Sequence, residues 1–98
     1  MHRYPARTES TAHRVVGDEA LIVNFQDSFF YNLSPVGTFI WERCDGQHSL
    51  AQIVEEIVNE YEIEAEEATR DCEHFLQELV QEGILVWRPS PEGSDTPA

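Results

Sequence analysis

The side chains that could act as acids, bases or nucleophiles are scattered along the 98-residue chain and form no catalytic motif. The acidic pairs Glu55–Glu56 and Glu66–Glu67 join adjacent residues, which point to different faces of a helix and cannot converge on one substrate atom. Ser34 and Ser49 stand where helices are predicted to begin, and neither lies in a nucleophile-elbow pattern. The four histidines are scattered, and no glycine-rich phosphate loop is present. The sequence therefore predicts a protein that is not an enzyme.

The two cysteines do not predict a metal site. The chain has no CxxC pair, and one residue separates Cys72 from His74, which places them on different faces of a helix. Cys72 lies on the apolar stripe of its predicted helix and is interpreted as a core residue. The chain is too short to surround a large cofactor, so we expect neither a metal nor a cofactor. With no signal-peptide pattern and no run of transmembrane length, we expect a cytoplasmic protein in which Cys44 and Cys72 are free thiols.

The net charge of −13 limits the partners that the chain can bind. The chain contains 19 acidic residues, six arginines and no lysine. Nucleic acids and anionic membranes attract basic surfaces, so we expect neither as a partner. Proteins or peptides that are neutral or basic fit best, although the acidity can also serve only to keep the protein in solution.

Turn residues and apolar periods predict an α+β domain in which a three-stranded antiparallel sheet is followed by three helices. The predicted strands are His13–Val16, Ala20–Phe25 and Phe29–Leu33. The predicted helices are Pro35–Cys44, Ser49–Tyr61 with a capping box at its start, and Ala65–Glu82. The apolar run Ile84–Trp87 adds an extended segment or covers the core. Residues 1–12 and 89–98 are polar and rich in proline, serine and threonine, and are predicted to be disordered tails around a domain of residues 13–88.

The predicted order of elements is that of a winged helix-turn-helix, a fold that usually binds DNA. A DNA recognition helix must present basic or amide groups to the groove and the phosphates. Here the third helix carries Arg70 as its only basic residue apart from His74, among many acidic residues. The charge therefore excludes the usual function of this topology.

The strand Phe29–Leu33 lacks the charges and the proline that normally protect the edge of a sheet. One interpretation is that it lies inside a wrapped sheet, or at an edge that a helix covers. The other is that its edge is open and accepts an extended peptide by strand addition, through main-chain hydrogen bonds and neighbouring side-chain pockets. The pattern alone leaves both interpretations open.

Over residues 14–86 the sequence resembles the PqqD-like family, small peptide chaperones named for a component of pyrroloquinoline quinone biosynthesis. The most specific match is the segment Leu33–Trp41 followed by Asp45–Gly46. The family usually has Asn where this chain has Ser34, and both residues are good N-caps. Further matches are Ser49–Ile53, Asp71–Cys72, Phe75–Leu76, Leu79 and Gly83–Leu85.

The resemblance implies a winged-helix-like domain that binds the leader peptides of ribosomally made natural products. The leader would add as a fourth strand beside the third strand, in a groove lined by the third helix. The domain would then present the precursor to a modifying enzyme, often a radical S-adenosylmethionine enzyme.

Carried onto this chain, the resemblance implies peptide-binding residues on one strand and one helix. They are Phe29, Phe30, Tyr31, Asn32, Leu33, Asp71, Phe75 and Glu78. Phe75 is alternatively a plain core residue, and the opposite border of the helix is an alternative groove wall, formed by Thr69, Glu73 and Val80. The alternative function is a structural or regulatory module that forms a homodimer through the same strand edge.

Overall fold

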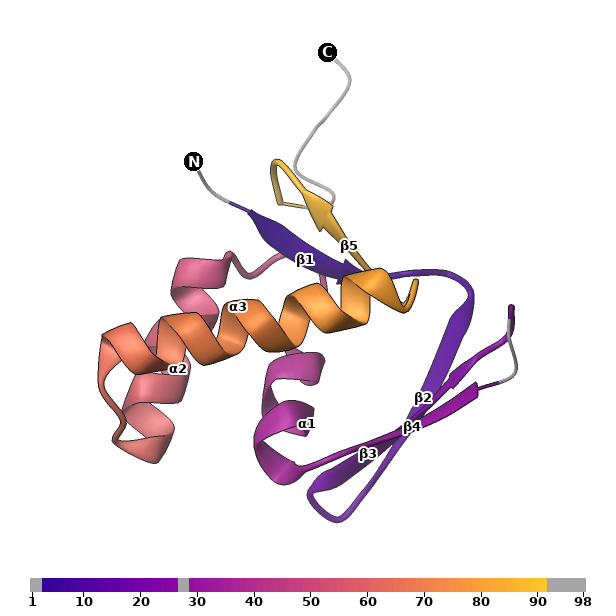
Figure 1. Cartoon of the computed structure of the whole chain (residues 1–98), viewed down its shortest axis with the longest axis horizontal. Helices are drawn as coiled ribbons and strands as arrows, with labels where there is room; N and C mark the ends of the chain where they lie inside the picture. Colours follow the sequence, from indigo (N-terminus) through magenta and orange to yellow (C-terminus); the bar gives the residue numbers. More distant parts are fainter. Residues whose placement is uncertain (1–2, 27–28, 92–98) are drawn as a thin grey trace.

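The structure is a computed structural model that describes residues 3–26 and 29–91 (Figure 1). Its elements follow in the order β1 (Tyr4–Arg7), β2 (Thr11–Val16), β3 (Glu19–Asn24), β4 (Phe29–Leu33), α1 (Pro35–Glu42), α2 (Leu50–Tyr61), α3 (Ala65–Gln81) and β5 (Leu85–Arg88). The predicted α+β class, with a three-stranded antiparallel sheet before three helices, is confirmed. Figure 1 shows this sheet projecting from the three helices, with β1 and β5 together on another side of α3.

The three-stranded sheet is an antiparallel meander in the order β2-β3-β4. β2 and β3 are joined by a two-residue hairpin in which Gly17 adopts a φ of +66°, a conformation that glycine adopts without strain. β2 begins at Thr11, earlier than predicted, because Thr11 pairs with Asn24 at the far end of the hairpin. β4 has the predicted bounds, Phe29–Leu33.

α1 and α2 begin at the predicted caps. The Ser34 hydroxyl accepts a hydrogen bond from the Gly37 backbone N–H, and Pro35 occupies the first helical turn. The capping box of Ser49 and Gln52 at the start of α2 is complete in both directions. α1 ends at Glu42, before the predicted Cys44, because the chain tightens there: Cys44 donates its backbone N–H to Trp41, three residues back.

The hydrophobic core lies between α1, α2, α3 and the inner face of the three-stranded sheet. Its largest fully buried apolar side chains are Trp41, Ile22, Ile53, Leu76, Ile84 and Leu85. Cys72 is buried in this core as predicted, and both cysteines are free. Burial raises the pKa of the Cys72 thiol to about 12 and also raises the pKa of Cys44, so both thiols stay protonated at neutral pH.

The prediction of a disordered N-terminal tail is wrong for the residues that form β1. Tyr4–Arg7 pairs antiparallel with β5, and Ala6 is 98% buried, with 2% of its surface exposed. Three loop bonds fix β1 further: Arg7 donates its backbone N–H to Cys44, Gly46 donates to Pro5, and Leu50 donates to Arg3. The polar composition was misleading because the strand pairing uses backbone groups, which every residue carries, while the burial of Pro5 and Ala6 alone is enough to anchor so short a segment.

At the other end, Ile84–Trp87 does add an extended segment, since Leu85–Arg88 forms β5. Of the predicted C-terminal tail, residues 89 and 90 are exposed, and residues 92–98 lie outside the described residues. None of the described helices is long and apolar enough to cross a membrane.

Candidate functional site

β4 is an edge strand. The strand order β2-β3-β4 places β3 in the middle, and in the described part of the chain β4 pairs with β3 alone. The structure therefore excludes the interpretation that Phe29–Leu33 lies inside a sheet, because within residues 3–26 and 29–91 the strand is paired on one side only.

The backbone groups of β4 point alternately toward β3 and toward the open edge. Ala20 donates its backbone N–H to the Thr38 hydroxyl at 2.8 Å, and this hydroxyl lies 3.5 Å from the Leu33 carbonyl oxygen. The backbone groups of Ala20 therefore point toward β4. Every second residue of β3 repeats this direction, so the backbone groups of Ile22 and Asn24 also point toward β4, opposite Tyr31 and Phe29.

It follows that Phe30 and Asn32 direct their N–H and C=O groups outward. No hydrogen bond within the described residues occupies these backbone groups. Two residues thus offer a short row of donors and acceptors to a chain that aligns with β4.

The side chains of β4 divide between the two faces of the sheet. Leu33 is buried on the inner face, and the Tyr31 hydroxyl donates to the Glu82 carboxylate at 2.9 Å, which brings the end of α3 against the sheet. Phe30 and Asn32 lie on the outer face, where Phe30 is 68% exposed.

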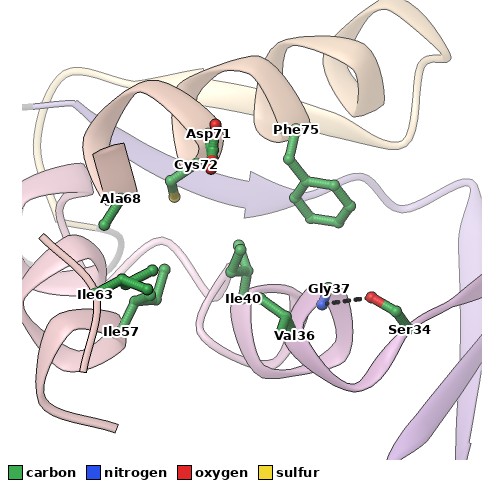
Figure 2. Close-up of a pocket in the computed structure, with 10 residues that line it drawn as sticks. All are labelled: Ser34, Val36, Gly37, Ile40, Ile57, Ile63, Ala68, Asp71, Cys72 and Phe75. Atoms are coloured by element: carbon green, nitrogen blue, oxygen red, sulfur yellow. Dashed lines mark hydrogen bonds between the residues drawn. The ribbon is translucent and has the colours of Figure 1, made fainter. Parts of the chain in front are cut away.

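A pocket of about 220 Å³ lies between α1 and α3 (Figure 2). It is lined by Ser34, Val36, Gly37, Ile40, Ile57, Ile63, Ala68, Asp71, Cys72 and Phe75. Figure 2 shows Phe75 descending from α3 toward Gly37 at the start of α1. A Cβ atom at position 37 would lie 3.3 Å from the Phe75 ring, so glycine allows this close approach of ring and helix.

Two of the three predicted α3 residues line this pocket. Asp71 and Phe75 do so, and Phe75 also packs against the core, so its two interpretations are compatible. Glu78, one turn beyond Phe75 and before Glu82, is exposed and lies outside the lining.

The opposite border of α3 has different neighbours. The Glu73 carboxylate pairs with Arg3 of the N-terminal segment, and Arg3 also lies 4.5 Å above the Trp87 ring. The Thr69 hydroxyl donates to the Ala65 carbonyl of its own helix at 2.7 Å. Glu73 is thus held by Arg3, just before β1, while Asp71 and Phe75 line the pocket together with residues of α1.

The contribution of α1 to the pocket was not predicted from the sequence. In the sequence, Val36, Gly37 and Ile40 lie within the segment Leu33–Trp41 that carries the resemblance, and no role in a groove is predicted for them. The one available signal was Gly37, because a glycine inside a predicted helix often marks a place where another side chain approaches the backbone closely.

Among the described residues, no group of three or more His, Cys, Asp or Glu side chains is placed to hold a metal ion. His13 packs edge-on against Trp41, and partial burial, together with the charge of Arg7, lowers its pKa. His13 therefore belongs to the packing between β2 and α1 and lies outside the pocket lining.

Fold and site together define a winged-helix-like domain with an open strand edge and, between α1 and α3, an apolar pocket. The chain belongs to the PqqD family: the family model described as coenzyme PQQ synthesis protein D matches residues 19–85. This confirms the resemblance noted in the sequence. No curated protein matches the chain.

Two solved structures are similar to the whole domain. One is TbiB1 in complex with the TbiA(beta) leader peptide, with a TM-score of 0.78, 23% identity, and coverage of 93% of this chain and 99% of that one. The other is lasso peptide synthetase B1 complexed with the leader peptide, with a TM-score of 0.77, 18% identity, and coverage of 85% and 98%. At these identities the likeness shows a shared fold.

Proposed function

We propose that this protein is a leader-peptide recognition element: a non-enzymatic domain that binds the leader segment of a ribosomally made precursor by strand addition at β4. The observation that carries the proposal is the outward row of backbone groups at Phe30 and Asn32. Membership of the PqqD family supports it, as do two proteins of the same fold whose structures contain a leader peptide.

The geometry explains how a leader would be held. Backbone bonds to Phe30 and Asn32 would supply affinity without depending on the leader sequence. Alternate side chains of the added strand would turn to the inner face of the sheet, on which Tyr31 reaches the end of α3. Phe75, Glu78 and the pocket between α1 and α3 would then select among those side chains.

Charge would add selectivity for basic leaders. Asp71 and Glu78 are exposed, and within the described residues neither forms an ion pair. A lysine or arginine of the leader would be attracted by these carboxylates, through contacts that salt weakens. A free leader must become ordered on binding, which costs part of the contact energy and gives moderate affinity.

The bound precursor would be presented to a modifying enzyme, which in this family is often a radical S-adenosylmethionine enzyme. The domain needs no catalytic group of its own for this role, because it supplies only a high local concentration and a fixed orientation of the substrate.

Titration of the isotope-labelled protein with synthetic peptides tests the proposal. The peptides are the N-terminal halves of the short reading frames encoded beside the gene. We expect amide shifts at residues 29–33 and along Asp71–Glu78. Asn32→Pro removes an outward N–H group and should weaken binding at least about tenfold, since a backbone bond is lost and a guest chain is blocked.

The matched control is Val15→Pro, on the opposite edge of the same sheet, where β2 pairs with β3 alone in the part of the chain that the structure describes. This variant should bind peptide as the wild type does. If neither substitution changes the peptide affinity, or if no amide shifts occur at residues 29–33, the peptide binds elsewhere. A tight dimer that no peptide dissociates in sedimentation experiments would favour the homodimer instead.

A further inference from the structure

β2 is the other edge strand of the three-stranded sheet, since within the described residues it pairs with β3 alone. Just beyond the paired strands, Phe25 donates its backbone N–H to the Ser10 carbonyl at 2.8 Å. Every second residue of β3 repeats this direction, so the backbone groups of Leu21 also point toward β2, where its partner is Arg14. The backbone groups of Arg14 therefore point into the sheet.

The neighbours of Arg14 on β2 have the opposite direction. His13 and Val15 point their N–H and C=O groups away from β3. No hydrogen bond within the described residues occupies these groups, and both residues are exposed. β2 thus offers a second short row of backbone donors and acceptors, on the edge of the sheet opposite β4.

A cavity of about 380 Å³ lies beside this second edge. It is lined by Val15, Gly17, Asp18, Pro35, Thr38, Phe39, Glu42 and Tyr61. These residues come from β2, the hairpin that follows it, α1 and the last position of α2. Val15 belongs both to the cavity and to the open edge, so a chain aligned with β2 can direct one of its side chains into the cavity.

The lining of this cavity suits a basic side chain. Phe39 and Tyr61 supply two aromatic rings whose centroids are 5.5 Å apart. Asp18 and Glu42 supply carboxylates, and within the described residues neither forms an ion pair. Arg43 already lies 3.5 Å from the centroid of the Phe39 ring, which shows that this aromatic pair attracts cations. The stem of a lysine or arginine can pack on the rings while its charged end meets the carboxylates.

The arginines of this region leave the two carboxylates of the cavity unneutralised. Arg43 is paired with Glu56 at 2.7 Å, and Arg7 donates to the Trp41 carbonyl at 2.7 Å. The side chain of Arg14 points to the opposite face of the sheet, because successive residues of a strand alternate between its faces. The cavity therefore presents negative charge to a chain that approaches the edge of β2.

We propose that the edge of β2 and this cavity form a second docking site, which binds an extended basic segment of a protein other than the precursor. The segment bonds to the backbone of His13 and Val15. Its side chain opposite Val15 is a lysine or arginine, which enters the cavity and reaches Asp18 and Glu42.

This site is separate from the leader site of the proposed function and does not depend on it. Chains added at β2 and at β4 would lie about 19 Å apart, which is four strand spacings, so one short segment does not occupy both edges. A second copy of this protein is a poor occupant, because two chains with a net charge of −13 repel each other.

Amide hydrogen exchange of the full-length protein tests the open edge before any ligand is added. The Arg14 N–H is bonded to β3 and should exchange slowly, whereas the His13 and Val15 N–H groups should exchange quickly. Slow exchange of His13 and Val15 in the free protein would show that the chain itself or a second copy covers the edge, and would overturn the proposal.

The probe is a synthetic peptide of about ten residues that alternates threonine and lysine, and the control peptide has glutamate in place of lysine. At about ten times its Kd, the lysine peptide should slow the exchange of His13 and Val15 about tenfold, because exchange then occurs from the free fraction. It should also shift the amide signals of residues 13–18 and 39–42. The glutamate peptide should do neither.

Two pairs of variants separate the two edges and the effect of charge. Val15→Pro removes an outward N–H of β2 and should weaken binding at residues 13–18 at least about tenfold, whereas Asn32→Pro, on β4, should leave it unchanged. Glu42→Gln should weaken the same binding at least about threefold. Its matched control is Glu55→Gln, which changes the net charge equally at an exposed position of α2 and should have no effect.

The outcomes separate this site from the leader site. If the lysine peptide shifts residues 13–18 in the Asn32→Pro variant, the second site exists independently of β4. Equal binding of the two peptides, or equal weakening by Glu42→Gln and Glu55→Gln, would overturn the basic partner. Leader binding is judged from residues 29–33, so either proposal can fail while the other stands.

Discussion

Two polar side chains hold the sheet against the helices. The Thr38 hydroxyl accepts the Ala20 N–H within the buried start of α1, and the Glu82 carboxylate and carbonyl accept bonds from Tyr31 and Asn24. The inner face of the sheet is therefore fixed at both ends of β4, while the outward backbone groups between them stay available. Rigid support beside an open edge favours binding, because little of the protein has to be ordered when the guest arrives.

Asp45 gives a prediction at the same scale. Partial burial alone would raise the pKa of this carboxyl, but the hydrogen bonds from the His48 ring and the Gln47 backbone N–H outweigh burial and hold the pKa below its usual 3.8. The ionised form therefore stabilises the fold above that pH, and this stabilisation is lost as the pH falls through the lowered pKa.

Asp45→Asn should accordingly lower the free energy of unfolding by about 1 kcal/mol near neutral pH, and the difference from wild type should shrink toward about pH 3. Urea unfolding across this range measures it. Glu55→Gln, at an exposed position on α2, is the control and should leave the free energy of unfolding near neutral pH close to that of the wild type. A constant difference at every pH would mean that the shape of the side chain, rather than its charge, is what matters.

At the scale of elements, the pairing of β1 with β5 is the main departure from the sequence prediction. β1 reaches across the loop between α1 and α2, and β5 follows directly after α3. Together these two strands attach the first and last elements of the fold to all three helices. A small core buries little surface per residue, so these additional contacts contribute to its stability.

Ala6 tests the role of β1. Ala6→Asp places a carboxylate at a site that is 2% exposed, and should lower the free energy of unfolding by at least about 2 kcal/mol. Ala12→Asp introduces the same change on an exposed position of β2 and should cost well under that. Thermal unfolding of the two variants measures the difference in stability. If residues 1–12 were disordered, the two substitutions would have equally small effects.

At the scale of the whole molecule, the excess of negative charge works against the compact fold. At a net charge of −13 on 98 residues, the acidic side chains repel one another, and ion pairs such as Arg43 with Glu56 at 2.7 Å offset part of this repulsion.

We therefore expect the free energy of unfolding to rise by about 1 kcal/mol between about 20 mM and about 500 mM sodium chloride, as the repulsion is screened. Urea unfolding at the two salt concentrations measures the change. A fall in stability with salt would instead show that ion pairs such as Arg43–Glu56 outweigh the repulsion.

Local signals were sufficient for most elements. The caps Ser34 and Ser49, the proline after the first of them, and the apolar period of α2 act through neighbouring residues, so a single sequence contains them. β1 carries no such signal, because its partner lies about 80 residues away along the chain.

By itself, the sequence determined the order of the elements from β2 to α3, the strongly acidic net charge, and the aromatic strand without protective charges. Only the tertiary structure decided that this strand lies at an edge, that Asp71 and Phe75 rather than Glu73 line the pocket with α1, and that the N-terminal segment is a strand. The physical reason is range: periodicity, capping and net charge are properties of neighbouring residues or of their sum. Edges, grooves and strand partners exist only when distant segments pack together.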